Sequence, residues 1–387
     1  MTSRSRVYIG NWDRWKTPEK DAFVVCELDA ATGALTRLGA QFPGVSVGQV
    51  VVDARRGVLY CTDETSRHPD RFDGGGGRVL AYRIDPATGW LTELSDRPSY
   101  GSLPSHLGLV AGGSRLVVTH HTDGPPVTRT SRRADGGFSV ESVYDDANTV
   151  LFPLDEDGAI GEPLDILTWH GDGGPLPRQT HPRLHSIAVA PSDAFFLVCD
   201  KGDDQVLTFR VVEGSRLEVS SVHRARPGSS PRYSAFHPSL PVVYVNHETQ
   251  TVIEALAYDD AGELRSLGHV DSLPPEAVDT GATMQSDIRV SPDGRFVYQL
   301  IRELDLISAF AVDARTGALT RIQTVAAGGR DPRGCALTLD GRHLLVAARL
   351  SDDVVCWSIG VDGMLTPTDH HVPAAAAGSI AVYDLPV

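Results

Sequence analysis

The sequence has few of the features that mark helical, membrane or secreted proteins. Long runs of helical apolar periodicity are scarce in its 387 residues, whereas turn-forming Gly (38) and Pro (25) are abundant. No apolar run approaches the roughly 20 residues of a membrane-spanning helix. The N-terminal segment MTSRSRVYIGNW lacks the apolar core of a signal peptide. These absences predict an all-β protein of the cytoplasm that is not inserted in a membrane.

Positive charge is also in short supply. The chain has 35 Lys and Arg against 50 Asp and Glu, which gives a net charge of −15, and its basic residues form no stripe. A nucleic acid or an anionic membrane surface is therefore not expected as a partner. The sequence indicates no particular oligomeric state.

Spacings that are typical of metal and cofactor sites are missing as well. There is no C-x-x-C pair and no glycine-rich loop of the kind that binds phosphate or a dinucleotide. The cysteines fall mostly in expected strands, as small buried side chains in a reducing compartment do; they are Cys26, Cys61, Cys199, Cys335 and Cys356. We expect chemistry that needs neither a metal nor a cofactor.

What the chain does contain is a repeat. An apolar strand, an acidic turn, a glycine and often Leu-Thr recur at spacings of roughly 45 to 70 residues. The clearest copies are Phe23–Leu38, Val79–Leu94 and Leu306–Ile322. Weaker copies are Val150–Pro163, Val206–Val219, Val252–Leu267 and Val354–Thr368. A repeat of this length is typical of a circular array of small sheets.

Each repeat has the strand pattern of a propeller blade. Two further apolar runs precede the repeated phrase, as in His185–Asp200, Tyr233–Glu248 and Ile288–Glu303. Turn-forming residues such as Pro-Asp-Gly separate these runs, and Asp-x-x-Thr-Gly joins the third strand to a fourth. Seven repeats of four antiparallel strands predict a seven-bladed β-propeller.

The two ends of the chain complement each other. Ser379–Val387 resembles a first strand that nothing follows, and the N-terminal runs RVYIG, FVVCELD and LTRLGA resemble strands two, three and four. A blade formed from both ends would close the ring and remove an exposed sheet edge. We therefore expect one domain over residues 1–387, with its last blade closed by the N- and C-terminal strands.

Three segments lengthen the connections between expected strands. Residues 124–147 enlarge the second blade between its second and third strands, and residues 170–183 and 272–285 lie between blades. Long loops on a rigid scaffold serve as lids or form plain surface. For Arg129, Arg132 and Arg133 the simpler interpretation is a solvated loop, and the alternative is a lid that meets an acidic substrate.

Ionisable residues recur at two equivalent positions of the repeat. Near the start of the inner strand these positions hold Gly48, His106, His185, Arg232, Ser286 and Arg333. At the end of the second strand they hold Glu64, Thr122, Lys201, Glu248, Arg302 and Arg349. Both sets should lie at one end of the channel, because antiparallel neighbours bring the start of one strand beside the end of the next. Such a ring predicts a pocket for an anionic ligand, and the alternative is a set of ion pairs lining a water-filled channel.

At these residues the chain resembles the seven-bladed lactonase family, which includes bacterial 6-phosphogluconolactonase and fungal carboxymuconate cyclase. The resemblance covers nearly the whole chain. It rests on the Asp-x-x-Thr-Gly-x-Leu turns and on the segments Arg178–Val189, Gly228–Pro238, Tyr244–Val252 and Ser291–Phe310. By position, it implies that the active-site His, Arg, Glu and Arg of the family correspond to His185, Arg232, Glu248 and Arg302.

Neighbouring positions depart from the family pattern. Tyr233 stands in place of a His, while His247 and Ile301 each stand in place of an Asn. Lys201 interrupts an Asp-Leu-Gly motif. Because the charged centre is kept while its polar neighbours change, we expect lactone or carboxylate chemistry rather than a sugar phosphate substrate.

The resemblance implies an enzyme that acts on a small anionic lactone or unsaturated carboxylate, by lactone hydrolysis or by lactonizing cycloisomerisation. His185 is assigned as general acid/base, because an imidazole pKa of about 6.5 suits proton transfer at neutral pH. Glu248 would orient His185 or act as the base itself. Arg232 and Arg302 would clamp a carboxylate or oxyanion. Substrate-binding roles are expected of Arg333, His106, Glu64, Lys201, Tyr233 and His247.

A second class of function stays open at this point. Propellers host many functions, so the fold is equally compatible with a non-catalytic scaffold that binds a protein or a small anionic ligand. The ring of ionisable residues favours the enzyme. The altered neighbours of its charged centre would suit a member recruited to a specialised pathway.

Overall fold

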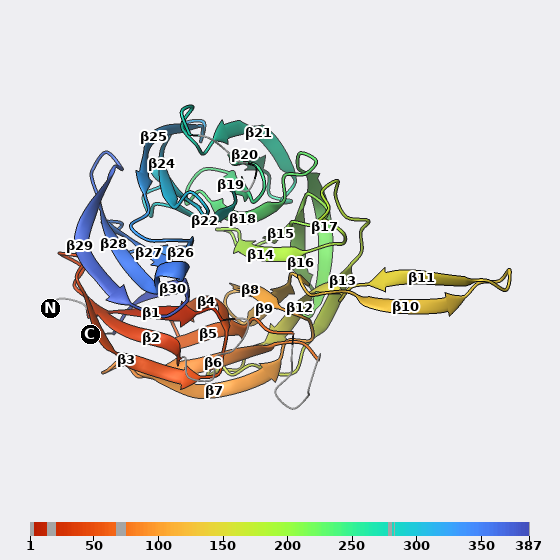
Figure 1. Ribbon diagram of the computed structural model, residues 1–387. Coiled ribbons are helices and arrows are strands. Elements are labelled where there is room, and N and C mark those ends of the chain that lie inside the picture. Colours follow the sequence, from red (N-terminus) through yellow and green to blue (C-terminus); the bar gives the residue numbers. More distant parts are fainter. Residues whose placement is uncertain (1–3, 14–20, 67–74, 278–280, 282, 387) are drawn as a thin grey trace.

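The computed structural model describes residues 4–13, 21–66, 75–277, 281 and 283–386. In this part of the chain, seven four-stranded antiparallel sheets are arranged in a ring (Figure 1). The prediction of a seven-bladed propeller is confirmed. The strands of each sheet follow one another from the channel outwards, so every blade presents its first strand to the centre.

The first four blades run in chain order. The first contains β4 (Val47–Asp53), β5 (Val58–Asp63), β6 (Arg78–Ile84) and β7 (Leu91–Pro98). The second contains β8 (Pro104–Val110), β9 (Arg115–His120), β12 (Ala147–Pro153) and β13 (Asp165–Trp169). The third contains β14 (Leu184–Val189), β15 (Phe196–Asp200), β16 (Gln205–Val212) and β17 (Arg216–Arg224). The fourth contains β18 (Pro231–Phe236), β19 (Val242–His247), β20 (Val252–Tyr258) and β21 (Leu264–Asp271).

The remaining blades complete the circle. The fifth contains β22 (Gln285–Val290), β23 (Phe296–Ile301), β24 (Leu306–Val312) and β25 (Leu319–Ala326). The sixth contains β26 (Pro332–Leu337), β27 (His343–Ala348), β28 (Asp353–Ile359) and β29 (Leu365–Pro373), with a 3-10 turn at Arg349–Ser351. The seventh contains β30 (Ala377–Asp384), β1 (Ser5–Asn11), β2 (Asp21–Leu28) and β3 (Leu35–Pro43).

The ring is closed by both ends of the chain, as the sequence predicted. The C-terminal strand β30 is the inner strand of the seventh blade and pairs antiparallel with β1, from Ser5↔Asp384 to Gly10↔Ser379. The backbone groups of both strands are thereby used within one sheet, and no open edge interrupts the ring at this point.

The repeated Asp-x-x-Thr-Gly segment folds as a tight turn for a local reason. In the first blade, Asp85 Oδ1 accepts hydrogen bonds from the N–H groups of Ala87 (3.0 Å) and Thr88 (2.7 Å). Gly89 then adopts φ 82°, in the left-handed region that favours glycine. The same arrangement recurs at Asp313, which explains why this phrase was the clearest mark of the repeat.

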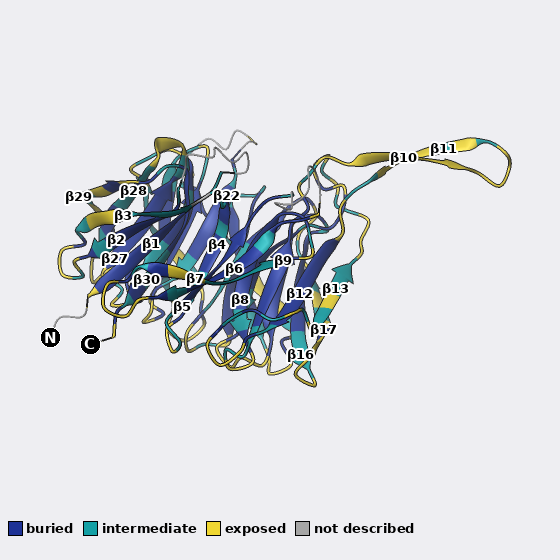
Figure 2. Ribbon diagram, turned by 90° about the horizontal axis from the view of Figure 1, so that it is seen from below, coloured by how far each residue is buried: buried dark blue, intermediate teal, exposed yellow. Residues whose placement is uncertain are grey.

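These turns also connect neighbouring blades. A tyrosine on the second strand of one blade donates its hydroxyl to the glycine carbonyl of the next blade's turn, as Tyr8 does to Gly89 (2.7 Å) and Tyr244 to Gly317 (2.8 Å). Apolar side chains of each adjacent pair of sheets form a buried cluster between them. Figure 2 shows the blade interiors as mostly buried strands. The blades are therefore held by a ring of separate cores, which leaves the centre for polar groups.

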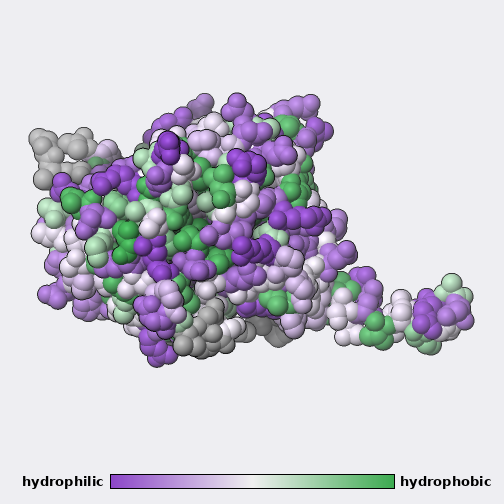
Figure 3. Space-filling view, turned by 90° about the horizontal axis from the view of Figure 1, so that it is seen from above, coloured by the Kyte–Doolittle hydropathy of each residue, from purple (hydrophilic) through white to green (hydrophobic). Residues whose placement is uncertain are grey.

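The insertion at 124–147 forms a projecting hairpin, which we call the arm, from β10 (Val127–Arg132) and β11 (Phe138–Val143). It extends away from the ring and is largely exposed (Figures 1 and 2), and its surface is a mixture of hydrophobic and hydrophilic residues (Figure 3). Arg129 pairs with Glu141 at 3.5 Å, Arg133 pairs with Asp135, and Arg132 lies over the ring of Phe138. The arginines of the arm thus contact the arm itself.

The other two insertions lie between blades, as expected. Residues 170–183 connect β13 to β14, and residues 272–285 connect β21 to β22. Of the second insertion, positions 278–280 and 282 lie outside the described residues. Among the described residues, no helix has the length and apolarity that a membrane span needs.

Candidate active site

The two sets of ring residues meet at one end of the channel. Arg232 near the start of β18 contacts Glu248, which follows β19, and Lys201 and Arg302 reach the same carboxylate from the neighbouring blades. Three consecutive blades therefore contribute to one charged cluster. The antiparallel geometry that placed strand starts beside strand ends is what brings these residues together.

Glu248 is the centre of this cluster and is almost fully buried. Its carboxylate accepts hydrogen bonds from Lys201 Nζ at 3.1 and 3.3 Å, and its Oε2 lies 2.8 Å from Arg232 Nε and 3.8 Å from Arg302 Nη2. Burial alone would raise the pKa of Glu248, but the three cations hold it well below its usual 4.5. Glu248 is thus a fixed anion around which the cations are held.

Arg232 keeps donors available although it touches Glu248. Its Nε lies close to the carboxylate, yet the N–H does not align with the oxygen. Nε and Nη1 are buried and hydrogen-bond to no described residue. The Arg302 Nε has no hydrogen-bond partner in the described chain either. Buried N–H groups without a partner are costly, and they are the kind of group that binds an oxyanion or carboxylate.

A second glutamate, Glu64, anchors the other side of the ring. Its carboxylate contacts His121 Nε2 at 2.9 Å and accepts a hydrogen bond of 2.7 Å from Trp12 Nε1. Gly48 makes room for it, because a Cβ at that position would lie 2.7 Å from Glu64 Oε2. Residues of the seventh, first and second blades therefore meet here, just as three blades meet at Glu248.

Arg333 is a further cation of the site, and no described carboxylate forms an ion pair with it. Its guanidinium stacks on the indole of Trp12, 3.6 Å from the ring centroid. Among the described residues it has no hydrogen bond and no carboxylate within ion-pair distance. Burial lowers the pKa of Arg333 to about 9. The charge of Glu64 raises this pKa, and the charge of Arg232 lowers it further. Arg333 stays charged at neutral pH and lacks the partner that such a charge requires.

His185 is buried beside these cations. Its ring lies edge-on to Tyr233 at 5.3 Å and 5.5 Å from the ring of His121. Its Nδ1 is buried and has no hydrogen-bond partner among the described residues. Burial, followed by the charges of Arg232 and Lys201, holds the pKa of His185 well below 6.5. At neutral pH the imidazole is therefore uncharged, with a lone pair that can take a proton.

Next to His185, the aromatic rings of Tyr233 and His106 contact each other in turn. The rings of His106 and Tyr233 are 5.5 Å apart, and His106 Nε2 lies 2.8 Å from Gln49 Nε2. Burial lowers the pKa of His106 to about 3, so it too is neutral at pH 7. His106, Gln49 and Arg289 border a cavity of about 460 Å³ whose other walls are apolar side chains of the inner strands.

Among the described residues of the site, cations outnumber carboxylates. The buried or nearly buried cations are Lys201, Arg232, Arg302 and Arg333, and the carboxylates are Glu64 and Glu248. The pairs Arg183–Asp123 and Arg349–Asp331 at the edge are internally neutral. A positive centre in a chain of net charge −15 is suited to an anionic ligand.

Some residues of the two aligned positions serve the fold instead. The Thr122 hydroxyl donates to Pro182 O, Ser286 donates to Pro332 O at 2.6 Å, and Arg349 pairs with Asp331. His247, expected to bind substrate, faces Glu254 and His269 instead of the Glu248 cluster. Successive strand residues point to opposite sides, which explains why His247 and Glu248 separate.

Two residues of the site were absent from the sequence prediction. His121 directly follows the second strand of its blade, one position before the aligned Thr122. Trp12 follows β1, which has the same place in the seventh blade. Extending the alignment by one residue, and including the blade shared by the termini, would have found both.

The comparisons with known proteins identify the family of the chain. A family model described as "Lactonase, 7-bladed beta-propeller" matches residues 6–382. The 6-phosphogluconolactonase of Bacillus subtilis (strain 168) is 29% identical over 329 residues, 84% of each chain, and that of Erwinia tasmaniensis is 27% identical over 87% of each chain. Both alignments cover more than four fifths of each chain, and both relatives are named as lactonases.

Solved structures show the same architecture. The periplasmic gluconolactonase of Pseudomonas aeruginosa superposes with a TM-score of 0.85 at 21% identity, covering 99% of this chain and 100% of that one. A putative 6-phosphogluconolactonase of Bacteroides fragilis gives a TM-score of 0.82 at 22% identity, covering 99% and 98%. With the family model matching nearly its whole length, the chain belongs to the seven-bladed β-propeller lactonase family.

Proposed function

We propose that the protein hydrolyses a small lactone that carries an anionic group, using His185 as the base. Family membership supports lactone chemistry. The observation that carries the anionic substrate and the assignment of the base is the excess of cations over carboxylates, among the described residues, beside a neutral imidazole whose Nδ1 has no partner there. No group outside this chain is needed for the steps that follow.

Hydrolysis needs a proton acceptor for the attacking water. His185 is neutral at pH 7, is buried, and has an Nδ1 without a partner, so it can take that proton. Glu248 suits this role less well, because the three cations around it weaken it as a base. The imidazolium formed on His185 then returns the proton to the ring oxygen that leaves as an alcohol.

The attacked carbonyl develops negative charge, which must be stabilised. The unpartnered N–H groups of Arg232 and Arg302 are preorganised for this purpose, since no other described group has to release them first. Arg333, stacked on Trp12, is available for the anionic substituent of the substrate. Glu248 positions the cations, which replaces the expectation that it orients His185.

The test is a proton-release and NMR assay on the purified protein. The panel contains sugar lactones with and without phosphate, muconolactones and unsaturated dicarboxylic acids. We expect stoichiometric proton release and ring opening for one class of anionic lactone. The His185→Ala variant should lose this turnover while the exposed His371→Ala variant retains it.

The alternatives give different results in the same assay. Double-bond movement or ring closure without net proton release would replace hydrolysis by the cyclase reaction. Binding of an anionic lactone without turnover would replace the enzyme by a binding protein. Turnover that survives in His185→Ala would remove His185 from the mechanism.

A further inference from the structure

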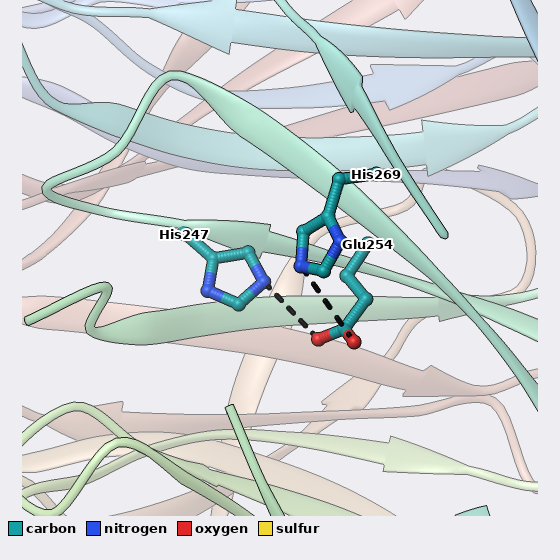
Figure 4. A group of neighbouring side chains, drawn as sticks. All are labelled: His247, Glu254 and His269. Atoms are coloured by element: carbon teal, nitrogen blue, oxygen red, sulfur yellow. Dashed lines mark ion pairs between the residues drawn. The ribbon is translucent and has the colours of Figure 1, made fainter. Parts of the chain in front are cut away.

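Outside the charged cluster, the fourth blade contains a second group of ionisable side chains that the proposed reaction does not use. His247 ends β19, Glu254 lies on β20 and His269 lies on β21, so three adjacent strands contribute one side chain each. Figure 4 shows both imidazoles directed at the Glu254 carboxylate. His223, on β17 of the third blade, approaches the same carboxylate from the side.

The distances in this group are too long for good hydrogen bonds. His247 Nε2 lies 3.6 Å from Glu254 Oε2, and His269 Nε2 lies 3.6 Å from Glu254 Oε1. Both Nε2 atoms are buried, and neither has a hydrogen-bond partner in the described chain. Buried polar atoms normally find a partner, so two of them around one carboxylate require an explanation.

The same distances fit a tetrahedral metal ion. With bonds of about 2.0–2.1 Å to His nitrogen, two ligands of a tetrahedral zinc ion are about 3.3–3.4 Å apart. One ligand atom from each of His247, Glu254 and His269 lies within 4.8 Å of the others. Small side-chain rotations would therefore bring all three onto one ion.

From this geometry we propose that His247, Glu254 and His269 form a binding site for a divalent transition-metal ion, with zinc the most suitable. Two histidines and one carboxylate are an established zinc ligand set, and the set leaves a fourth position open. His223 Nε2 lies 3.4 Å from Glu254 Oε2 and holds the carboxylate from the outside, as second-layer partners of metal sites do.

The position of this site gives it a structural consequence. His247 immediately precedes Glu248, and His223 belongs to the neighbouring blade. An ion bound here would fix the end of β19 and tie the third and fourth blades together near their outer strands. The three proposed ligands are not among the residues that the proposed hydrolysis uses.

Zinc binding can be measured directly on the full chain. Protein stripped with a chelator is titrated with Zn²⁺ in competition with a chromophoric chelator, and the bound metal is counted by mass spectrometry after gel filtration. We expect one equivalent for the wild type. His269→Gln and Glu254→Gln should each bind at least tenfold more weakly, since removing even an outer partner costs about 10–100-fold.

A matched control comes from the sixth blade. His371 pairs with Asp353 at 2.9 Å, and the described part of the chain offers no third ligand there, so His371→Gln should leave zinc binding unchanged. Circular dichroism verifies that each variant is folded, and Co²⁺ absorption in the visible range reports tetrahedral coordination. Absence of stoichiometric zinc binding in the wild type would overturn the proposal. Zinc binding as tight as that of the wild type in both His269→Gln and Glu254→Gln would overturn it as well.

Discussion

Two buried glutamates of the fourth blade, Glu248 and Glu254, have opposite kinds of neighbours. Glu248 is surrounded by the ammonium and guanidinium groups of Lys201, Arg232 and Arg302. Glu254 is surrounded by the imidazoles of His223, His247 and His269. In both cases the pKa of the carboxyl lies well below 4.5, although burial alone would raise it.

The two carboxylates are suited to different roles because their neighbours differ. The cations around Glu248 neutralise its charge and are themselves held in place, so the cluster presents N–H donors to the channel. Imidazoles around Glu254 offer lone pairs as well as donors, and lone pairs are what a metal ion needs. One blade thus carries an anion-binding cluster at its inner end and a candidate metal-binding cluster further out.

The largest effect on activity is expected from replacing His185, the proposed base beside the Glu248 cluster. His185→Ala should lower kcat/KM for the preferred lactone on the order of 10²–10⁴-fold, the usual contribution of a positioned acid/base group. Steady-state kinetics of the wild type, His185→Ala and the exposed His371→Ala measure this. A loss below tenfold would show that another group activates the water.

The two glutamates should also differ in stability. Glu248→Gln leaves three buried cations without their anion, so we expect a loss of about 3 kcal/mol in the free energy of unfolding. Glu254→Gln in metal-free protein should cost only about 1 kcal/mol, because its contacts with the imidazoles are long, at 3.4 to 3.6 Å. Denaturant unfolding of both variants gives the values, and equal losses would contradict the comparison.

The pH dependence of stability separates histidines from glutamates. His106 and His120 are buried and neutral, and burial lowers their pKa values to about 3 and about 4. In the unfolded chain they gain protons below pH 6.5, so stability is present above that pH and falls as pH decreases towards 4. The slope is at most about 1.4 kcal/mol per pH unit for each histidine.

Glu248 contributes to acid lability only below pH 4.5, where its unfolded form takes up a proton. Between pH 7 and 4.5 the buried Asp200, whose pKa is raised to about 7 by burial, acts in the opposite direction, because its folded form holds a proton that the unfolded form has lost. Comparing the wild type with His120→Gln at pH 7, 5.5 and 4.5 therefore isolates the histidine contribution. His120→Gln should flatten the decline over this range. An unchanged slope would mean that His120 is not neutral in the folded protein.

The smallest effect is expected where a carboxylate–cation pair lies in water. On the arm, Glu141 and Arg129 are more than half exposed and 3.5 Å apart. Glu141→Gln should change the free energy of unfolding by about 0–1 kcal/mol. Comparison with Glu248→Gln in the same unfolding experiment isolates the contribution of burial.

Much of the architecture could be predicted from the sequence, because it depends on interactions between residues that are close together in the chain. The Asp-x-x-Thr-Gly turns are formed by contacts within five residues, and the closing blade follows from which strands each terminus supplies. Both predictions are confirmed. The hairpin structure of the arm could not be predicted in this way, because residues 124–147 contain no copy of the repeat.

The site could be predicted only as far as the repeat equivalences extend. Glu248, Arg232, Lys201 and Arg302 occupy aligned positions, and they meet because the ring is regular. Trp12 was missed because the N-terminal segment joins the ring through the last blade. The grouping of His247 with His269 depends on pairing between β20 and β21, which periodicity does not reveal.

The most direct test of the account measures charge recognition by Arg333. kcat/KM is determined for an anionic lactone and for its uncharged analogue, in the wild type and in Arg333→Gln, with Arg129→Gln on the arm as control. We predict that Arg333→Gln loses at least tenfold on the anionic lactone, mainly through KM, and little on the analogue. Equal effects on both lactones, or no preference for the anionic one in the wild type, would contradict a channel built to bind an anion.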